Sequence, residues 1–464
     1  MLRKGKIATI AGAVFAVILL ECGPMAVMPG SGEALAQAHA DRAQRHIERR
    51  EQAIRRLHRL ERLDALRRID RPTLRRIIEY RQSRAIAERR KAAIRALIRN
   101  HKGAWVMRHQ ILALVPDEAA LDRLRPLGFR LARMRRFEAL GFSVAVLGTP
   151  KGLEPDDALA LARKTLPDIR FEAHHLFDPS GDTVTATSPM EQDGPLPWQG
   201  LPVAEGLKIG QIDLGVDSGH PALKGAHMIL RSFVGAQEPV PSEHGTAIAS
   251  LLVGRLGSFA GASSGAVLYA ADVFGDGAEG GSVEAILSAL DWMAAERVPV
   301  VAMPLAGPRN LLLELALDKV SAKGMLVVAP VGNDGPTMPV AWPAAHPAVV
   351  AVTATDKGGE VFLTAHRGPE VMLAAVGVGL PAAADPGTLL AVEGTSFAVP
   401  EVASRLLRLY RAPDPERTEG AILALMETAR DLGTPGRDPV YGAGWVSYAG
   451  LPDIADATVQ RPKE

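Results

Sequence analysis

From residue 200 onward, strand-like runs alternate with helix-like runs, and this alternation constrains the fold more than any other feature of the chain. The strand-like runs are apolar almost throughout: KIGQIDLGV, AVLYAADVFG, VPVVAMPLA, GMLVVAPVGN and AVVAVTATD. The helix-like runs are GTAIASLLVGRL, SVEAILSALDWMAAERV, LLLELALDKVSAKG and ERTEGAILALMETARD. Continuously apolar strands are typical of a sheet that helices cover on both faces. The alternation therefore predicts an α/β domain with a doubly wound, mostly parallel sheet over residues 200–455.

A smaller domain is predicted upstream, over residues 105–178. Its strand-like runs are MRHQILALVP, FRLARMRRFEAL, FSVAVLGTP and DIRFEAHHLFDP, and its helix-like runs are DEAALDRLRPLG and EPDDALALARKTLP. The resulting order β-α-β-β-α-β is that of a ferredoxin-like α+β domain. Residues 179–199 are polar and contain Pro and Gly, which predicts an exposed linker between the two domains.

The first 38 residues have the layout of a targeting segment. A basic start precedes an apolar run from Ile7 to Leu20 and the small-residue sequences ALA and AQA. This layout predicts a secretory signal peptide and hence an extracytoplasmic protein, periplasmic or secreted. An uncleaved membrane anchor is the alternative: the run is short for a span, which needs about 20 residues, but Glu21 is the only charge between it and Met28. The only cysteine, Cys22, lies in this segment, so no disulfide is expected.

Residues 39–102 are strongly basic, with 21 Lys and Arg against 8 Asp and Glu, although the whole chain has a formal charge of +1. The spacing of Ile and Leu predicts two helices, the second beginning near Pro72. This basic helical segment is expected to be a solvated spacer or to contact an anionic membrane surface or the acidic remainder of the chain. Nucleic acid is not an expected partner, because no aromatic interleaving or base-reading motif accompanies the arginines.

Three polar residues stand where predicted strands end or predicted helices begin. Asp213 ends the strand in KIGQIDLGVDSGHP, His244 begins the helix in SEHGTAIASLLVG, and Ser396 begins the helix in EGTSFAVP. A serine hydroxyl becomes a nucleophile when an imidazole takes its proton and a carboxylate orients that imidazole. Each residue alone also has a structural interpretation: Asp213 as a turn residue, His244 as a neighbour of a helix cap, and Ser396 as an N-cap.

Together, the three motifs resemble those of the subtilisin-like serine peptidases (subtilases, peptidase family S8), in the order Asp, His, Ser. The resemblance spans about residues 200–450 and places Asp213, rather than Asp217, in the catalytic position with His244 and Ser396. It also implies that the side chain of Asn333, in VVAPVGNDGP, forms an oxyanion hole with the backbone N–H of Ser396.

The resemblance further implies a set of substrate-binding residues, where the sequence departs from the family. The set is Pro304, Leu305, Ala306, Gly307, Val331 and Gly332. The family's usual Asn-Met-Ser-Leu-Gly run is replaced by AMPLAG, and Ala247 replaces a frequent second histidine outside the triad. Because Pro304 has no backbone donor, pairing with a substrate strand is expected to be weakened or reshaped there.

The function implied by the resemblance is that of an exported serine endopeptidase, made as a precursor. Residues 105–178 would then be a propeptide that assists and inhibits the catalytic domain until the linker is cut. Substrates would be proteins or peptides, and no cofactor is expected to be required. Calcium sites are common in the family, but the isolated acidic residues assign no ligands. The alternative is a catalytically silent subtilisin-like domain that acts as a binding or scaffold protein.

Overall fold

The computed structural model describes residues 95–115, 118–179, 195–199, 201, 203–235, 238–275, 280–384 and 387–447. The chain forms two compact units, 1–70 and 71–464, and all the described residues belong to the second. The predicted signal peptide or anchor, most of the basic helical segment and most of the linker lie outside the described residues. Within the described part of the chain, no helix is both long and apolar enough to cross a membrane.

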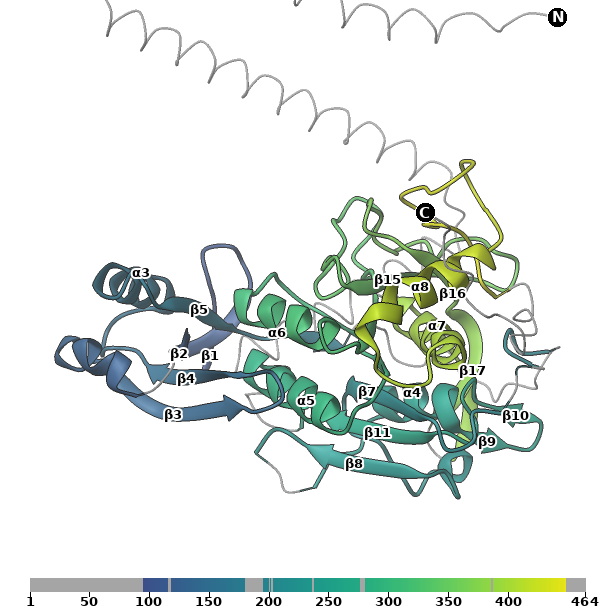
Figure 1. The fold of residues 1–464 in the computed structure, drawn as a ribbon, viewed down its shortest axis with the longest axis horizontal. Helices are drawn as coiled ribbons and strands as arrows, with labels where there is room; N and C mark the ends of the chain where they lie inside the picture. The colour runs from purple at the N-terminus through teal and green to yellow at the C-terminus, as the bar shows by residue number, and fades with distance from the viewer. Residues whose placement is uncertain are drawn as a thin grey trace, which may run out of the picture. The chain divides into compact units, whose positions relative to one another are not determined.

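The centre of the second unit is a seven-stranded sheet in which every neighbouring pair is parallel (Figure 1). In spatial order the strands are β16 (Leu373–Val376), β15 (Val349–Thr355), β14 (Leu326–Pro330), β12 (Val300–Ala302), β7 (Lys208–Asp213), β11 (Val267–Asp272) and β8 (Met228–Ser232). The order β12-β7 marks a point where the winding direction reverses, as expected for a doubly wound sheet. The predicted fold class is confirmed.

Helices cover both faces of this sheet, and alternate residues of one strand belong to different cores. Val300 of β12 packs in one core with residues of α4 (Glu243–Val253) and α7 (Thr395–Leu409). Its neighbour Val301 packs in the other core with residues of α5 (Val283–Ala295) and α6 (Leu311–Ser321). Since side chains alternate across a strand, this division explains why the strands are apolar throughout. A further helix, α8 (Thr418–Glu427), packs against α7.

Several elements differ from the sequence-based expectation. The run VPVVAMPLA forms two strands, β12 and β13 (Leu305–Ala306), because Pro304 makes a turn in which the Leu305 N–H donates to the Met303 carbonyl at 2.8 Å. Strands β8 and β16 and the antiparallel hairpin β17 (Val378–Ala384) and β18 (Thr388–Glu393) were not predicted. Short elements complete the domain: β9 (Arg255–Leu256), β10 (Phe259–Ala260), η2 (Pro221–Leu223) and η3 (Pro415–Arg417).

The upstream domain has the predicted order of elements. Its antiparallel sheet runs β3 (Arg130–Phe137), β4 (Phe142–Gly148), β2 (Trp105–Leu114) and β5 (Arg170–His175). The connecting helices are η1 (Ala119–Leu127), of 3-10 type, and α3 (Pro155–Thr165). The expected helix does not extend to residue 100: Leu97–Arg99 forms strand β1, which pairs with β2 through a turn at Gly103. Strand pairing therefore overrides the helical spacing of this stretch.

The upstream domain contacts α5 through a buried carboxylate. Glu284, in the first turn of α5, has a side chain only 5% exposed, and it accepts hydrogen bonds from Arg133 and Arg135 of β3, the latter at 2.7 Å. Burial raises the pKa of Glu284, but the hydrogen bonds and charge of Arg133, together with the charges of His174 and Arg135, hold the pKa below its ordinary value. Because Glu284 is buried whereas the side chains of Arg133 and Arg135 are 32% and 51% exposed, loss of the arginines would leave a buried carboxylate without its partners, so this contact anchors β3 to α5.

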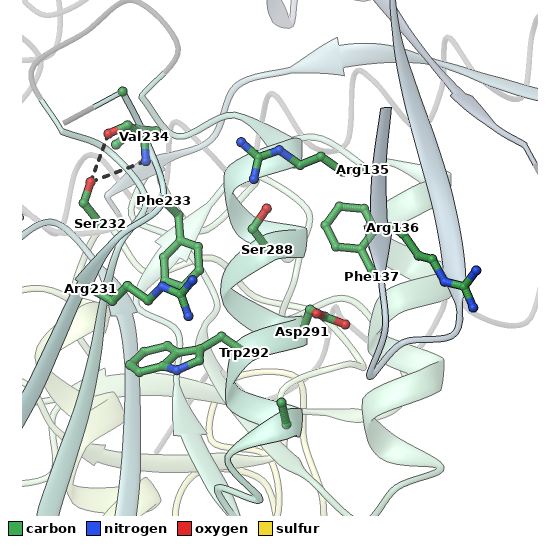
Figure 2. A pocket seen from close by; sticks show the side chains of 12 residues that line it. Arg135, Arg136, Phe137, Arg231, Ser232, Phe233, Val234, Ser288, Asp291 and Trp292 are labelled. Atoms are coloured by element: carbon green, nitrogen blue, oxygen red, sulfur yellow. Dashed lines mark hydrogen bonds between the residues drawn. The ribbon is translucent and has the colours of Figure 1, made fainter. Parts of the chain in front are cut away.

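A cavity of about 630 Å³ opens beside this anchor, between β3, the end of β8 and α5 (Figure 2). Arg231 lies over the ring of Phe233, with its guanidinium carbon 5.2 Å from the ring centroid, and 5.9 Å from that of Trp292. Asp291, whose pKa is raised by burial, accepts a hydrogen bond from the Leu140 N–H at 3.0 Å. The cavity thus marks the seam between the two domains.

Candidate active site

The three predicted catalytic residues lie at a strand end and two helix starts. Asp213 is the last residue of β7, which is flanked by β12 and β11, and its side chain is fully buried. His244 is the second residue of α4, and Ser396 is the second residue of α7. Helices α4 and α7 pack on the same face of the sheet and contact each other. The topology therefore carries residues far apart in sequence to one edge of the sheet.

The imidazole of His244 is oriented by Asp213. His244 Nδ1 lies 2.9 Å from Asp213 Oδ2 and 3.1 Å from Oδ1, and both side chains are buried. A carboxylate only accepts hydrogen bonds, so Nδ1 carries the proton and Nε2 is the acceptor in the neutral ring. Nε2 is buried and has no hydrogen-bond partner among the described residues. His244 thus presents an unused basic nitrogen.

Ser396 is not the N-cap of its helix. The N-cap of α7 is Gly394, whose φ of +143° suits glycine, and Ser396 follows it by two residues. Ser396 is fully buried, and no described residue hydrogen-bonds to its Oγ. The ring of Phe397 lies 5.5 Å from that of His244, centroid to centroid, so the histidine packs against the start of α7. A buried, unpaired hydroxyl is costly, which fits a chemical rather than a capping role.

Pro400 lies inside α7, as its sixth residue and therefore beyond the first turn. Its missing N–H would have bonded to the carbonyl four residues earlier, that of Ser396, so the helix loses a regular hydrogen bond at this point.

Close backbone contacts fix α4 against the end of β7. A Cβ on Gly245 would lie 2.3 Å from the Leu214 carbonyl oxygen, and a Cβ on Gly215 would lie 2.2 Å from that of Val240. The side chain of Gln211 in β7 also donates from Nε2 to the Gly245 carbonyl at 2.9 Å. These contacts require glycine at both positions, and they set the distance between Asp213 and His244.

Asn333 is oriented by the residue that precedes Ser396. Its Oδ1 accepts hydrogen bonds from the Thr395 N–H at 3.1 Å and from Thr395 Oγ1 at 2.8 Å. Because Oδ1 is engaged by two donors, the amide group is fixed with Nδ2 as its remaining donor. Thr395 was not singled out from the sequence, although it lies inside the GTS motif.

Part of the predicted substrate-binding set contacts the last described residues of the upstream domain, Phe177, Asp178 and Pro179, which are called the tail below. Leu305 and Ala306 of β13 pair antiparallel with β6 (Asp178–Pro179), opposite Pro179 and Asp178 respectively. Phe177, just before β6, is 1% exposed and donates its N–H to the Gly281 carbonyl at 2.7 Å. A Cβ on Gly307 would lie 2.3 Å from the Phe177 ring, so only glycine admits this ring.

The other members of that set bond within the domain. Pro304 makes the turn between β12 and β13. The Val331 N–H donates to the Val352 carbonyl, and its carbonyl accepts from the Ala341 N–H. The Gly332 carbonyl accepts from the His366 N–H at 3.0 Å.

Asp217 is the other acidic residue of the Asp motif. Asp217 Oδ1 accepts from the Gly219 N–H at 2.9 Å, and its own N–H donates to Thr246 Oγ1, so it is a turn residue. Within the described part of the chain, no group of three or more His, Cys, Asp or Glu side chains lies together as a metal site would require. The expectation about calcium stays untested.

The fold and this site describe an α/β protein with an Asp, a His and a Ser gathered at one edge of a parallel sheet. Within that class, residues 204–444 match the sequence model of the Subtilase family, and the chain belongs to that family.

Comparisons with individual proteins agree. The chain is 32% identical to Subtilisin E of Bacillus subtilis over 251 residues, which cover 52% of this chain and 64% of that protein. It is 30% identical to the Minor extracellular protease Epr of the same organism over 258 residues, covering 54% of this chain and 39% of Epr. The chain thus spans less than two thirds of the length of either relative.

The fold is also found in a solved structure. The crystal structure of fervidolysin from Fervidobacterium pennivorans, a keratinolytic enzyme related to subtilisin, aligns with a TM-score of 0.59 at 18% identity. The alignment covers 75% of this chain and 62% of that one. At this identity the likeness concerns the fold.

Proposed function

We propose that this chain is a serine endopeptidase that cleaves proteins or peptides. Ser396 Oγ attacks the carbonyl carbon of the scissile bond while its proton passes to His244 Nε2. His244 then gives this proton to the leaving amine as the C–N bond breaks, and water repeats the sequence on the acyl-enzyme. Asp213 orients His244 and stabilises the imidazolium. The observation that carries this proposal is the contact of His244 Nδ1 with Asp213. Among the described residues, neither the remaining ring nitrogen Nε2 nor the buried Ser396 Oγ has a hydrogen-bond partner.

The oxyanion of the tetrahedral intermediate would be held by Asn333 Nδ2 and the Ser396 N–H. The Thr395 hydrogen bonds to Asn333 Oδ1 support this role, because they fix the amide before any substrate binds. Donors that need no reorganisation stabilise developing charge more than solvent does. The position of Ser396 near the start of α7 adds the favourable end of the helix dipole.

The upstream domain would be a propeptide whose tail occupies the substrate site. Phe177, Asp178 and Pro179 run antiparallel along β13, which is how an extended peptide adds to a sheet edge. The pairing supports substrate binding at AMPLAG despite Pro304, with a reshaped rather than lost strand. Self-processing would then cut the linker that follows this tail, and export would agree with the layout of residues 1–38.

Labelling with a fluorophosphonate tests the proposal. This probe reacts with a serine only when a base activates the hydroxyl, so the chain whose linker has been cut and whose propeptide has left should be labelled at Ser396, as mapped by mass spectrometry of its peptides. Hydrolysis of a denatured protein substrate should be lost in proportion to labelling. A chain that binds peptides but resists labelling would instead be the silent scaffold protein.

The upstream domain should loosen on acidification. Burial lowers the pKa of His174 from 6.5 to about 4, in a site shared with Glu284 and Arg133. Burial likewise lowers the pKa of His175, near Glu172, Lys102 and Asp156. His175 Nδ1 faces the Asn310 amide at 2.9 Å; because Asn310 Oδ1 caps α6, its Nδ2 donates and Nδ1 must accept. Protonation of His175 would replace this hydrogen bond between the domains by two opposed donors.

The stability window follows from the sign of these shifts. At about pH 7.5, a unit above the ordinary value of 6.5, both histidines are almost fully neutral whether buried or free, so the native form keeps its full stability. As the pH falls toward 4, the unfolded or detached domain binds protons that the native form excludes, at a cost of about 1 kcal/mol for His174 alone by about pH 5.5. The thermal midpoint of the uncleaved chain should therefore drop between about pH 7.5 and 5.5. A double variant with His174→Gln and His175→Gln should show a weaker pH dependence of the thermal midpoint. His227→Gln, at an exposed position, should show the same dependence as the wild type. Equal slopes in the wild type, the double variant and His227→Gln would contradict the prediction.

A further inference from the structure

His366 contacts the backbone on both sides of Asn333. Its side-chain Nε2 accepts a hydrogen bond from the Asp334 N–H at 2.8 Å, and its backbone N–H donates to the Gly332 carbonyl at 3.0 Å. The residue is 3% exposed. His366, which is distant in sequence, therefore hydrogen-bonds to the residue before Asn333 and to the residue after it.

Packing reinforces these two hydrogen bonds. Gly332 has a φ of +107°, and a Cβ there would lie 2.5 Å from His366 Cε1 and Nδ1. The ring thus fills the space that a side chain at position 332 would occupy, and the positive φ is one that other residues rarely adopt. The imidazole therefore packs closely against Gly332 while its Nε2 bonds to the Asp334 N–H, so one ring contacts both neighbours of Asn333.

We propose that His366 is a positioning residue for the oxyanion hole, acting through the backbone on both sides of Asn333. This inference rests on the proposed function and extends it. Thr395 fixes the Asn333 side-chain amide by donating to Oδ1, and His366 fixes the backbone next to Asn333 by accepting from the Asp334 N–H. The position of the donor Nδ2 is thus restrained through both the side chain and the backbone. A displacement of about 1 Å in such a donor is enough to reduce turnover strongly, because the stabilisation depends on its distance from the developing charge.

Substitution of His366 should lower turnover rather than substrate affinity. His366→Leu removes the acceptor and the fit beneath Gly332, and it should reduce kcat about tenfold or more while KM changes little. His366→Gln keeps an acceptor oxygen and should recover much of the loss. His346 supplies a matched control, since it is also buried and accepts a backbone N–H, from Ala348 at 3.2 Å. His346→Leu should lower thermal stability to a similar extent and leave kcat unchanged.

A double-mutant cycle with Asn333→Ala decides the matter. If His366 acts through Asn333, then His366→Leu should lower kcat only when Asn333 is present and should have almost no effect in the Asn333→Ala chain. Equal reductions of kcat in both backgrounds would overturn the inference while leaving the peptidase proposal intact. If His366→Leu does not fold, the same cycle with His366→Gln gives the same decision. A wild-type chain that neither cleaves substrate nor labels at Ser396 would overturn both proposals.

Discussion

Ser396→Ala should abolish peptide cleavage and fluorophosphonate labelling together, and the chain should accumulate at its uncut size. Removing the serine of such a triad lowers kcat by about six orders of magnitude in a bacterial subtilisin, and a similar loss is expected here. In the proposed mechanism the remaining groups cannot replace it, because Ser396 Oγ is the nucleophile and His244 Nε2 is its base. Size on a denaturing gel and hydrolysis of a chromogenic peptide are the two measurements.

The control for this variant is Ser321→Ala, at the last residue of α6. It makes the same chemical change away from the site and should keep both cleavage and labelling. If the Ser396→Ala chain is nevertheless processed to the same smaller form, self-processing is wrong and another peptidase cuts the linker. If it still hydrolyses peptides at an undiminished rate, the assignment of the nucleophile is wrong.

Asp213→Asn should lower kcat by about four orders of magnitude at neutral pH, as the equivalent change does in another serine-protease triad. Asparagine has nearly the shape of aspartate, so the fold should persist. However, its amide can donate to His244 Nδ1, which favours the tautomer with the proton on Nε2 and removes the base. The imidazolium formed during catalysis also loses its counter-charge. Turnover measured beside thermal stability separates this chemical effect from unfolding.

The matched variant is Asp217→Asn, four residues later. Asp217 accepts a backbone N–H from Gly219 in a turn, a role that asparagine also fills, so its turnover should be close to that of the wild type. The opposite ranking, with Asp217→Asn inactive and Asp213→Asn active, would reverse the assignment of the catalytic carboxylate.

The central fold could be predicted because its strands are buried on both faces and therefore read as continuous apolar runs. Strand β8 was missed because it is an edge strand, in which Ile229 is 44% exposed and Arg231 interrupts the apolar pattern. Strand β16 has the sequence LAAV, whose alanines favour a helix as readily as a strand. The β17 and β18 hairpin combines Ala, Gly and Pro, residues with weak strand preference, so tertiary packing rather than local preference determines it.

The candidate site also combines features that local sequence predicts with features that it does not. Asp213, His244, Asn333 and Ser396 could be proposed from the sequence, because each lies in a short motif at a predicted strand end or helix start. The pairing of β6 with β13 and the contacts of His366 with Gly332 and Asp334 could not be predicted, because they join residues distant in sequence and have no local pattern. The capping interpretation of Ser396 was settled only by the backbone, which assigns that position to Gly394.

The pairing of β6 with β13 also has a consequence for how inhibition by the proposed propeptide would depend on protein concentration. While the chain between residues 179 and 195 is intact, the tail is tethered to its own site at an effective concentration on the order of millimolar. A free peptide at micromolar concentration would then rarely displace it. Once that connection is cut, the same contacts hold a separate molecule, whose occupancy falls with dilution. One peptide bond would thus convert an inhibition that is independent of protein concentration into one that depends on it.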